Sequence, residues 1–482
     1  MKFLVRFAGE IAIKSPHVRR QFLSRLTHNI RTAMKNADLS GSVTQEWGRV
    51  WVESDSSLIV ELLSQVYGIQ SFSPVEYSCP SDMESILETG KNYASVIEGK
   101  TFAVKARRAG THPYSSMDIQ KNLGGMLNQG RGQVCLTRPD VTVSVEVRDD
   151  ICRFFSQVIP GPGGLPLGTG GKAVCLMSGG FDSPVAAWMM QKRGISMDYL
   201  LCNMAGDAYE RAVLKVCKWL CDHWSHGTKP KFHVVDFAPV VEELKNKVSS
   251  RYTQVVLKRL FYRVGEMLAK ETKAEALVTG EAIAQVSSQT LTNLRAIEDV
   301  ADVPVMRPLI AFDKEDIIKL SRKIGTCALS SGIQEFCQVV PVKPATSCPV
   351  SVARDEESQF DLSILENVFA DRKILVPGEL SQSELTSAYL YQESVEPDAV
   401  VVDCRSKSEF DQWHYQGATH IDYYDLADSW KKHFSKDQKI LIYCSVGMQS
   451  AILAEKMQSD GYLAYSFKGG ARALMKLAES EN

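Results

Sequence analysis

The chain has 482 residues, of which 44% are hydrophobic and 23% are charged, and its net charge is -2 at pH 7. This length exceeds what one hydrophobic core can organise, so several domains are expected. No apolar run reaches the roughly 20 residues of a membrane-spanning helix, and charges interrupt the apolar N-terminal stretch, unlike in a signal peptide. These features exclude an integral membrane protein and predict a cytoplasmic one, whose twelve cysteines are mostly reduced thiols.

Two small α+β units are predicted in the N-terminal part, at residues 1–72 and 73–166, because alternating strand patterns and helical spacing succeed one another there. The Gly/Pro-rich stretch 160–171 marks the boundary that follows them. Basic residues mixed with glycine and aromatic residues over 102–129 suit a surface that follows a phosphate backbone. A solvated charged face is the alternative, and charge alone does not decide between the two.

Residues 172–348 alternate short apolar runs of the buried parallel type with long helical segments. This order predicts a doubly wound parallel sheet. A helical linker is expected at 349–396, followed by a last α/β domain at 397–482, where further apolar strands alternate with helices.

The sharpest motif is Ser178-Gly179-Gly180-Phe181-Asp182-Ser183, which lies between a predicted strand and a predicted helix. The glycines let the backbone approach an anion, and serine hydroxyls and the amides at the helix start donate to it. The motif therefore predicts a phosphate-binding loop, with a tight strand-to-helix turn as the alternative. Asp182 could orient magnesium or pyrophosphate, or it could simply cap the helix.

Cys444 also lies in a loop between a strand and a helix, within ILIYCSVGMQSAILAEKM. Backbone amides and a helix start lower the pKa of a thiol, which favours a thiolate and a persulfide anion. A phosphatase of the same fold would need Arg at position 450, where Ser450 stands. A buried, inert cysteine is the alternative for Cys444.

Cys217, Cys221, His223 and His226 invite comparison with a metal site. The two cysteines are one helical turn apart among core-type neighbours, and no second ligand pair has the spacing of a structural zinc site. No metal site is predicted in this segment.

The loop 178–183 resembles the PP-loop of the ATP pyrophosphatase superfamily, whose members adenylate a carbonyl oxygen. The segments 277–282 (LVTGEA), 285–294 and 308–326 narrow this resemblance to the ThiI family of tRNA 4-thiouridine synthetases, or tRNA sulfurtransferases, over nearly the whole chain. The resemblance implies ATP and Mg²⁺ as cofactors. The nucleotide-contacting positions of the family correspond to Leu176, Met177, Lys258, Gly280 and Gln289, beside the loop residues Ser178, Gly179, Gly180 and Ser183. From its helical context alone, Lys258 could equally be a solvated lysine.

The same resemblance implies a ferredoxin-like domain at 1–72, a THUMP RNA-binding domain at 73–166, a PP-loop domain at 172–348 and a rhodanese-like domain at 397–482. The pattern 402–405, Glu409-Phe410, His414 and 417–421 matches the rhodanese family, although Met448 and Gln449 follow Gly447 where many rhodaneses have arginine. THUMP domains of this family recognise the acceptor end of tRNA. The expected contacts, chiefly to phosphates and sugars, are Lys105, Arg107, Arg108, Lys121 and Arg131.

The implied reaction starts with adenylation of uridine O4, at position 8 of tRNA in this family, with Asp182 in a catalytic role. Sulfur from a cysteine desulfurase then reaches the base through a persulfide on Cys444, which attacks directly or is released as hydrosulfide by Cys337. In this family, a cysteine at the place of Cys337 partners the rhodanese cysteine; Cys348 is a competing candidate. The resemblance also implies sulfur supply to a carrier protein for thiamine thiazole synthesis. Two alternatives stay open: another PP-loop tRNA thiolase, and a non-catalytic tRNA-binding sulfur-relay scaffold.

Overall fold

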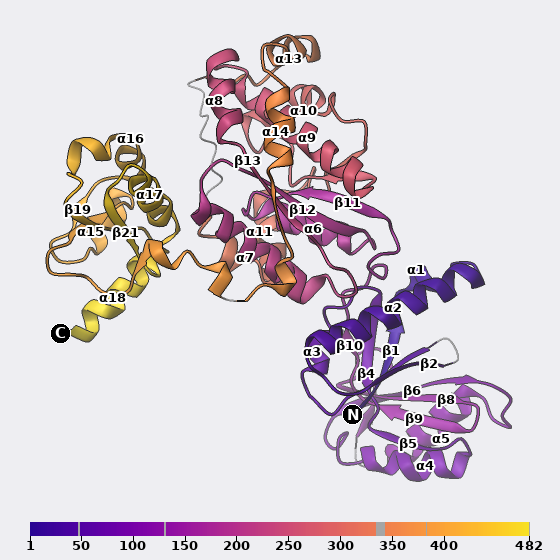
Figure 1. The fold of residues 1–482 in the computed structure, drawn as a ribbon. Helices are drawn as coiled ribbons and strands as arrows, with labels where there is room; N and C mark the ends of the chain where they lie inside the picture. Colours follow the sequence, from indigo (N-terminus) through magenta and orange to yellow (C-terminus); the bar gives the residue numbers. More distant parts are fainter. Residues whose placement is uncertain (47–48, 130–131, 334–342, 382, 482) are drawn as a thin grey trace. The chain divides into compact units, whose positions relative to one another are not determined.

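The computed structural model describes residues 1–46, 49–129, 132–333, 343–381 and 383–481. The chain divides into two compact units (Figure 1). The first consists of Met1–Thr169 with Lys192–Gly194, and the second of Gly170–Gln191 with Ile195–Asn482.

The first unit begins with a five-stranded sheet in the order β10-β4-β1-β3-β2, whose neighbouring strands all pair antiparallel. Its elements are β1 (Lys2–Phe7), α1 (Gly9–Ala12), α2 (Pro16–Asn36), β2 (Ser42–Glu46), β3 (Arg49–Glu53), α3 (Ile59–Leu63), β4 (Ile69–Pro74) and β10 (Ile159–Pro160). The Ser15 side chain caps α2. Pro16 takes the first helical position, where an N–H group would have no partner within the helix, so proline loses no hydrogen bond. The apolar face of α2 packs into the core of this sheet.

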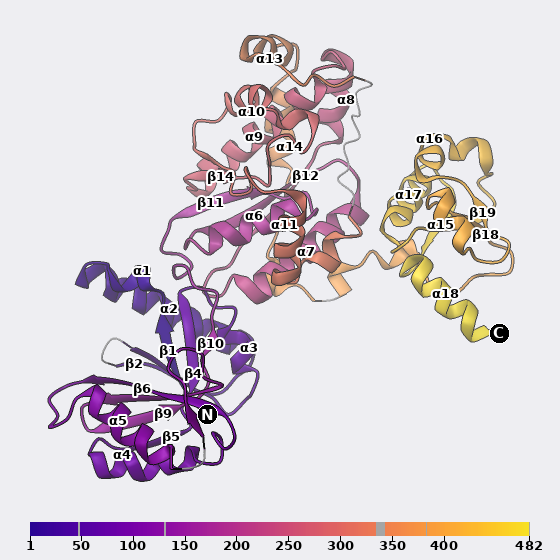
Figure 2. The same ribbon diagram turned by 180° about the vertical axis from the view of Figure 1, so that it is seen from behind.

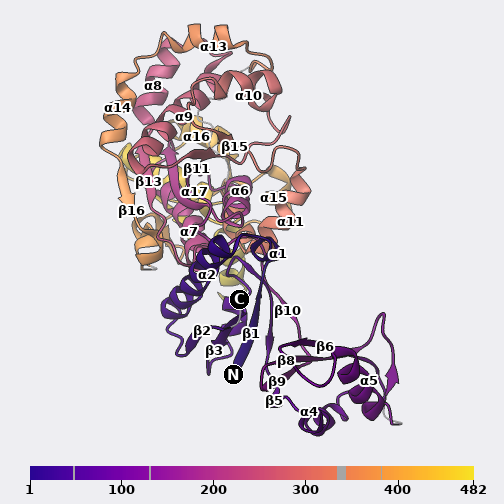
Figure 3. The ribbon, with the colours of Figure 1, turned by 90° about the vertical axis from the view of Figure 1, so that its right-hand side faces the viewer.

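The second sheet of this unit has the order β5-β9-β8-β6-β7. Its elements are β5 (Tyr77–Pro80), α4 (Met83–Gly90), the 3₁₀ turn η1 (Lys91–Tyr93), β6 (Thr101–Ala109), α5 (Ser116–Leu127), β7 (Gln133–Val134), β8 (Val141–Arg148) and β9 (Ile151–Phe155). Helices α4 and α5 cover one face (Figure 3). Along β6, Phe102, Val104 and Ala106 point into this core, so the strand alternation turns Lys105 and Arg107 to the other face.

The second unit contains a six-stranded sheet in the order β15-β14-β11-β12-β13-β16, parallel except for the edge strand β16. Its strands are β11 (Lys172–Leu176), β12 (Ser196–Asn203), β13 (Phe232–Asp236), β14 (Ala276–Val278), β15 (Val305–Met306) and β16 (Lys373–Leu375). Its helices are α6 (Asp182–Gln191), α7 (Asp207–Trp224), α8 (Ala238–Lys247), α9 (Thr253–Thr272), α10 (Leu291–Glu298), α11 (Lys314–Ile324) and α12 (Cys327–Ser330), with a 3₁₀ turn η2 (Ser287–Gln289).

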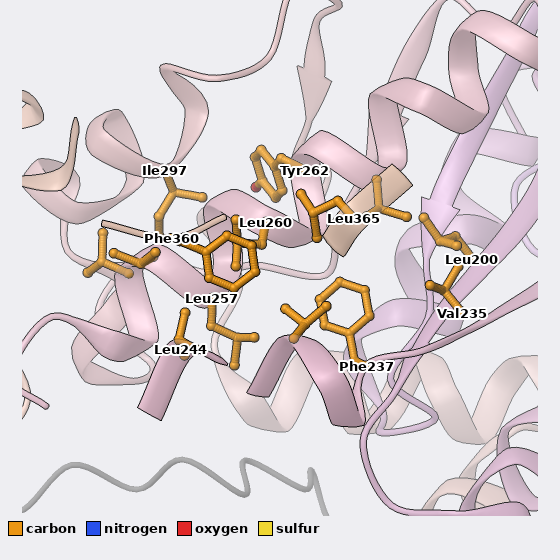
Figure 4. Close-up of a cluster of buried hydrophobic side chains, with 14 of the residues drawn as sticks. Leu200, Val235, Phe237, Leu244, Leu257, Leu260, Tyr262, Ile297, Phe360 and Leu365 are labelled. Carbon is orange, nitrogen blue, oxygen red and sulfur yellow. The ribbon is translucent and has the colours of Figure 1, made fainter. Parts of the chain in front are cut away.

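Helices lie on both sides of this sheet, with α6, α7 and α11 on one side and α8, α9 and α10 on the other (Figure 2). The predicted doubly wound sheet is thereby confirmed. Phe237, Leu257 and Leu260 lie in the core under α8 and α9 (Figure 4). Phe360 and Leu365 join the same core from the segment predicted as a linker.

Residues 349–396 contain α13 (Val350–Glu357), α14 (Ser363–Ala370), β16, the 3₁₀ turns η3 (Pro377–Glu379), η4 (Ser383–Leu385) and η5 (Ala388–Leu390), and β17 (Tyr391–Gln392). The C-terminal parallel sheet has the order β17-β21-β20-β18-β19. Its further elements are β18 (Val400–Asp403), α15 (Lys407–Gln412), β19 (Thr419–His420), α16 (Tyr423–His433), β20 (Lys439–Tyr443), α17 (Met448–Ser459), β21 (Leu463–Phe467) and α18 (Gly470–Glu481). Among the described helices, none has both the length and the apolar character needed to cross a bilayer.

Candidate active site

The loop 178–183 joins β11 to α6 at the carboxyl end of the parallel sheet. Gly179 has a φ of +77°, and a Cβ there would lie 2.8 Å from a Val213 methyl carbon, so both conformation and space require glycine. The Ser178 amide donates to Ser183 Oγ at 3.2 Å, which closes the loop on itself. A Cβ on Gly280 would lie 2.7 Å from the Ser183 amide nitrogen, so only glycine lets the turn after β14 approach the loop this closely.

Asp182 is the first residue of α6, and only 4% of it is exposed. Lys314 Nζ donates to both of its carboxylate oxygens, at 2.7 and 3.0 Å, and Gln285 Nε2 donates to Oδ2 at 2.8 Å. Lys314 is itself 44% exposed at its side chain. An acidic group of the loop and a basic group of α11 are thus in contact at the point where α6 begins.

A cavity of about 580 Å³ opens beside this loop. Of the residues predicted to serve the nucleotide, those that line it are Leu176, Met177, Ser178, Asp182, Ser183, Lys258, Gly280 and Gln289. Gly179 and Gly180 shape the loop but are not part of the lining. Leu200, Leu257 and Phe261 supply an apolar wall, which suits a nucleobase, while the loop end is polar. Within the described part of the chain, the buried Gln289 Oε1 has no hydrogen-bond partner, so it is available to a ligand.

Lys258 in α9 does not point into solvent; its Nζ donates to Glu281 Oε1 at 3.0 Å. Tyr262 Oη and Arg307 Nε donate to Glu281 Oε2 at 2.5 and 3.0 Å. Burial opposes the charge of this carboxylate, but Lys258, Tyr262 and Arg307 outweigh it and lower the pKa of Glu281 to about 2. Glu281 therefore stays ionised and holds Lys258 against the cavity wall.

A second candidate catalytic group, the thiol of Cys444, lies just after β20 in the C-terminal sheet. Cys444 is 1% exposed, and its Sγ accepts from the Gly447 amide at 3.1 Å and from Ser450 Oγ at 3.5 Å. The hydrogen bond from the Cys404 thiol, against the effect of burial and aided by Ser450 and the Val446 amide, lowers the pKa of Cys444 to about 5. Cys444 is therefore a thiolate at neutral pH, the form that acts as nucleophile.

Cys337 and Arg131 lie outside the described residues. The residues just before Cys337 contact two functional loops of the second unit. Ser330 Oγ donates to the Gly180 carbonyl at 3.2 Å, and a Cβ on Gly332 would lie 2.8 Å from Val446 Cγ2. Cys348, by contrast, is fully buried in the core under α9, and burial raises the pKa of its thiol.

The described basic residues of the predicted RNA surface lie in the second sheet and its helices. Lys105, Arg107 and Lys121 are exposed, whereas Arg108 is half-buried and donates to the Gly110 carbonyl at 2.7 Å. Lys105 and Arg107 share the open face of β6, and Lys121 lies on α5, which covers the opposite face. The structure thus brings the first two together and separates Lys121 from them.

Sequence reasoning missed Lys314, Glu281 and Cys404 as site residues. Lys314 and Glu281 lie in segments whose resemblance to the family was clear, at 308–326 and 277–282, so position in a matching motif was an available signal. Their partners are remote along the chain, and only the fold brings them together. For Cys404, no motif indicated a role in chemistry.

A Ser-Gly-Gly loop beside an ATP-sized cavity, combined with a low-pKa cysteine on a second parallel sheet, defines a class: PP-loop nucleotide-binding proteins that carry a rhodanese-like domain. Family models agree with this class. They match a ferredoxin-like domain of ThiI at residues 2–73, a THUMP domain at 81–156, the family described as thiamine biosynthesis protein (ThiI) at 168–362, and a rhodanese-like domain at 386–476.

Relatives resemble the chain over almost its whole length. A tRNA sulfurtransferase of Desulfurococcus amylolyticus is 34% identical over 473 residues, covering 97% of each chain. One of Vibrio campbellii is 37% identical over 475 residues, covering 96% of this chain and 98% of the relative. The chain therefore belongs to the ThiI family of tRNA sulfurtransferases.

Two solved structures are similar to it. One is the crystal structure of a 4-thiouridine synthetase–RNA complex with bound ATP, with a TM-score of 0.69 and 32% identity over 78% of this chain and 98% of that one. The other is a protein of Pyrococcus horikoshii, with a TM-score of 0.54 and 25% identity over 67% and 99% of the two chains.

Proposed function

We propose that this chain is an ATP-dependent tRNA uracil 4-sulfurtransferase, which makes 4-thiouridine in tRNA. The observation that carries the proposal is the pairing of the cavity at loop 178–183 with the thiolate of Cys444 in one chain. The similar structure holds RNA and ATP, and the relatives are named tRNA sulfurtransferases.

In the proposed first step, ATP binds with its base against the apolar wall and its phosphates at the loop amides and serines. Uridine O4 attacks the α-phosphate, and pyrophosphate leaves. The oxygen of the base, otherwise a poor leaving group, then departs as AMP. Lys258 lines the cavity and Lys314 contacts Asp182 beside it, and we assign both cations to phosphate charge.

The oxygen atoms available at the loop also fit Mg²⁺. This ion usually binds through one or two carboxylates plus substrate phosphates, and Asp182 places a carboxylate at the loop. Asp182 would hold the ion, which would neutralise charge on the phosphates. Lys314 orients that carboxylate through hydrogen bonds to both of its oxygens.

In the proposed second step, Cys444 carries a persulfide received from a cysteine desulfurase. In one route, its outer sulfur attacks C4 of the adenylated uridine and expels AMP; Cys337 then attacks Cys444 Sγ, and the S–S bond to the base breaks as a Cys337–Cys444 disulfide forms. In the other route, Cys337 first attacks Cys444 Sγ and releases the outer sulfur as hydrosulfide, which attacks C4 and expels AMP. Ser330 and Gly332, a few residues before Cys337 in the chain, contact the two loops, which supports this role of Cys337.

We assign Lys105 and Arg107, on the open face of β6, to the proposed tRNA surface; Arg108, Lys121 and Arg131 remain further contacts predicted from the sequence. We also propose a cytoplasmic location, which a tRNA substrate and the expected reduced cysteines support. As a second role, we propose that the Cys444 persulfide supplies a sulfur-carrier protein for thiamine thiazole synthesis, as the name of the matching family model suggests.

The test is AMP formation from ATP by purified protein, with and without unmodified tRNA. We expect tRNA-dependent AMP formation that falls at least about a hundredfold in Asp182→Ala, because the loop loses its carboxylate. Asp316→Ala is the matched control, since Asp316 is an exposed residue of α11 whose carboxylate contacts Lys319. Normal turnover in Asp182→Ala would contradict the assignment. A lack of any AMP formation by the unaltered chain would favour the sulfur-relay scaffold.

A further inference from the structure

Two cysteines meet at the carboxyl ends of neighbouring strands in the C-terminal sheet. Asp403 of β18 pairs with Tyr443 of β20, so Cys404 and Cys444 are each the first residue after a paired position. Neighbouring strands lie about 4.8 Å apart, within the Cα separation of about 4.4 to 6.8 Å that a disulfide spans. The Cys404 amide donates to the Tyr443 carbonyl at 3.0 Å, which fixes this register past the end of the strands.

Both thiols are enclosed by the same core. Each is 1% exposed, and both belong to the cluster that contains Val402, Tyr423 and Leu426. The Cys404 S–H has two acceptors, the Tyr443 carbonyl at 3.2 Å and the Cys444 sulfur, of which the ionised sulfur carries the charge. This arrangement raises the pKa of Cys404 and lowers that of Cys444, so one is a thiol and its neighbour a thiolate.

We propose that Cys404 is a second reactive thiol of the sulfur-carrying site, which releases the outer sulfur of a Cys444 persulfide as hydrosulfide. The inference rests on the proposed function, because it requires that persulfide. It also assigns a release step to two cysteines of the rhodanese-like domain, in addition to the release step proposed for Cys337.

Both cysteine sulfurs and the proton that this step uses belong to the C-terminal domain. Cys404 Sγ forms a bond to Cys444 Sγ, and the bond from Cys444 Sγ to the outer sulfur breaks. The electron pair leaves with the outer sulfur, which takes the Cys404 proton and departs as HS⁻. The two cysteines are oxidised to a disulfide while the outer sulfur is reduced, and an external dithiol reductant restores both thiols.

The experiment uses the full chain with Cys337→Ser, so that Cys337 cannot contribute. Cysteine and a cysteine desulfurase load Cys444, the desulfurase is removed, and released hydrosulfide is measured in one turnover without added thiol. Mass spectrometry of the peptides follows the persulfide on Cys444 and the disulfide between Cys404 and Cys444. We expect hydrosulfide to be released at the same rate as that disulfide forms.

Adding Cys404→Ser should slow release more than tenfold and leave the persulfide on Cys444. Serine keeps a hydrogen-bond donor at this position, so the pH dependence of Cys444 alkylation checks that the site is intact; Cys404→Ala should shift that dependence to higher pH. Cys135→Ser is the matched control, because Cys135 also has a lowered pKa but lies in the first unit. Equal release with and without Cys404, or release without the disulfide, would overturn the inference. If Cys444 acquires no persulfide in any of these chains, the Cys337→Ser chain included, the proposed function and this inference with it would be overturned.

Discussion

At the scale of single residues, the carboxylate of Glu281 organises the cavity wall. It accepts hydrogen bonds from Lys258, Tyr262 and Arg307, and it is almost completely buried. Glu281→Gln would leave the two cations without their shared counterion. We expect a loss of about 3 kcal/mol in the free energy of unfolding and a higher KM for ATP.

The contribution of Glu281 to the free energy of unfolding should decrease at low pH. The folded pKa of Glu281, about 2, lies below its ordinary value of 4.5, so the unaltered chain loses this contribution as pH falls from 4.5 toward 2. Urea unfolding at pH 7 and at pH 3 measures it, and the difference between chain and variant should shrink at pH 3. An equal difference at both pH values would contradict the ion-pair account.

Cys444 provides a second residue-scale prediction. Because its pKa is lowered to about 5, its alkylation rate should rise between pH 4 and 6 and be nearly constant above pH 7. Ser450→Ala removes one donor to Cys444 Sγ and should shift the midpoint upward. Rates followed by mass spectrometry of the Cys444 peptide test this. A midpoint near 9, the ordinary value, would show that the loop does not stabilise the thiolate.

At the scale of elements, the sequence predicted what is local. The loop 178–183 and the loop after β20 each join a strand to a helix in a few consecutive residues, so motif and spacing identified them. The contact of Lys314 with Asp182 spans 132 residues, and that of Cys404 with Cys444 arises from strand register. Such contacts depend on which strands become neighbours, and that is not encoded in local pattern. The same limit applies to β16, a three-residue edge strand beyond two helices.

The open face of β6 is the element proposed to meet tRNA. Lys105→Glu with Arg107→Glu should weaken tRNA binding and reduce the salt dependence by about 1.5 in log–log slope, because about 0.7 to 0.9 is lost per phosphate contact. Filter binding between 50 and 200 mM salt measures both quantities. Lys91→Glu, an exposed lysine in η1, serves as control. An unchanged slope would remove β6 from the RNA surface.

At the scale of the whole molecule, the proposed sulfur transfer requires the Cys444 loop to come within reach of the nucleotide cavity. Within the second unit, the Glu455 carboxylate of α17 accepts hydrogen bonds from the Asp207 and Ala208 amides, at 2.6 and 2.9 Å, at the start of α7. An anion at a helix N-terminus is stabilised by the helix dipole. This contact joins the two domains of that unit.

Glu455→Ala should therefore slow sulfur transfer to tRNA about tenfold, because the tethered domain spends less time docked. Persulfide loading and AMP formation should be unchanged. Glu479→Ala, an exposed carboxylate on α18, is the matched control. Parallel loss of AMP formation in Glu455→Ala would indicate a structural role instead of docking.

In the proposed function, ATP consumption and sulfur insertion are coupled in this one chain. The most direct measurement supplies purified protein with ATP, unmodified tRNA, cysteine and a cysteine desulfurase, and counts AMP and 4-thiouridine. We expect one AMP for each 4-thiouridine, and AMP without 4-thiouridine in Cys444→Ala. Thiolation without AMP formation, or normal thiolation in Cys444→Ala, would contradict it.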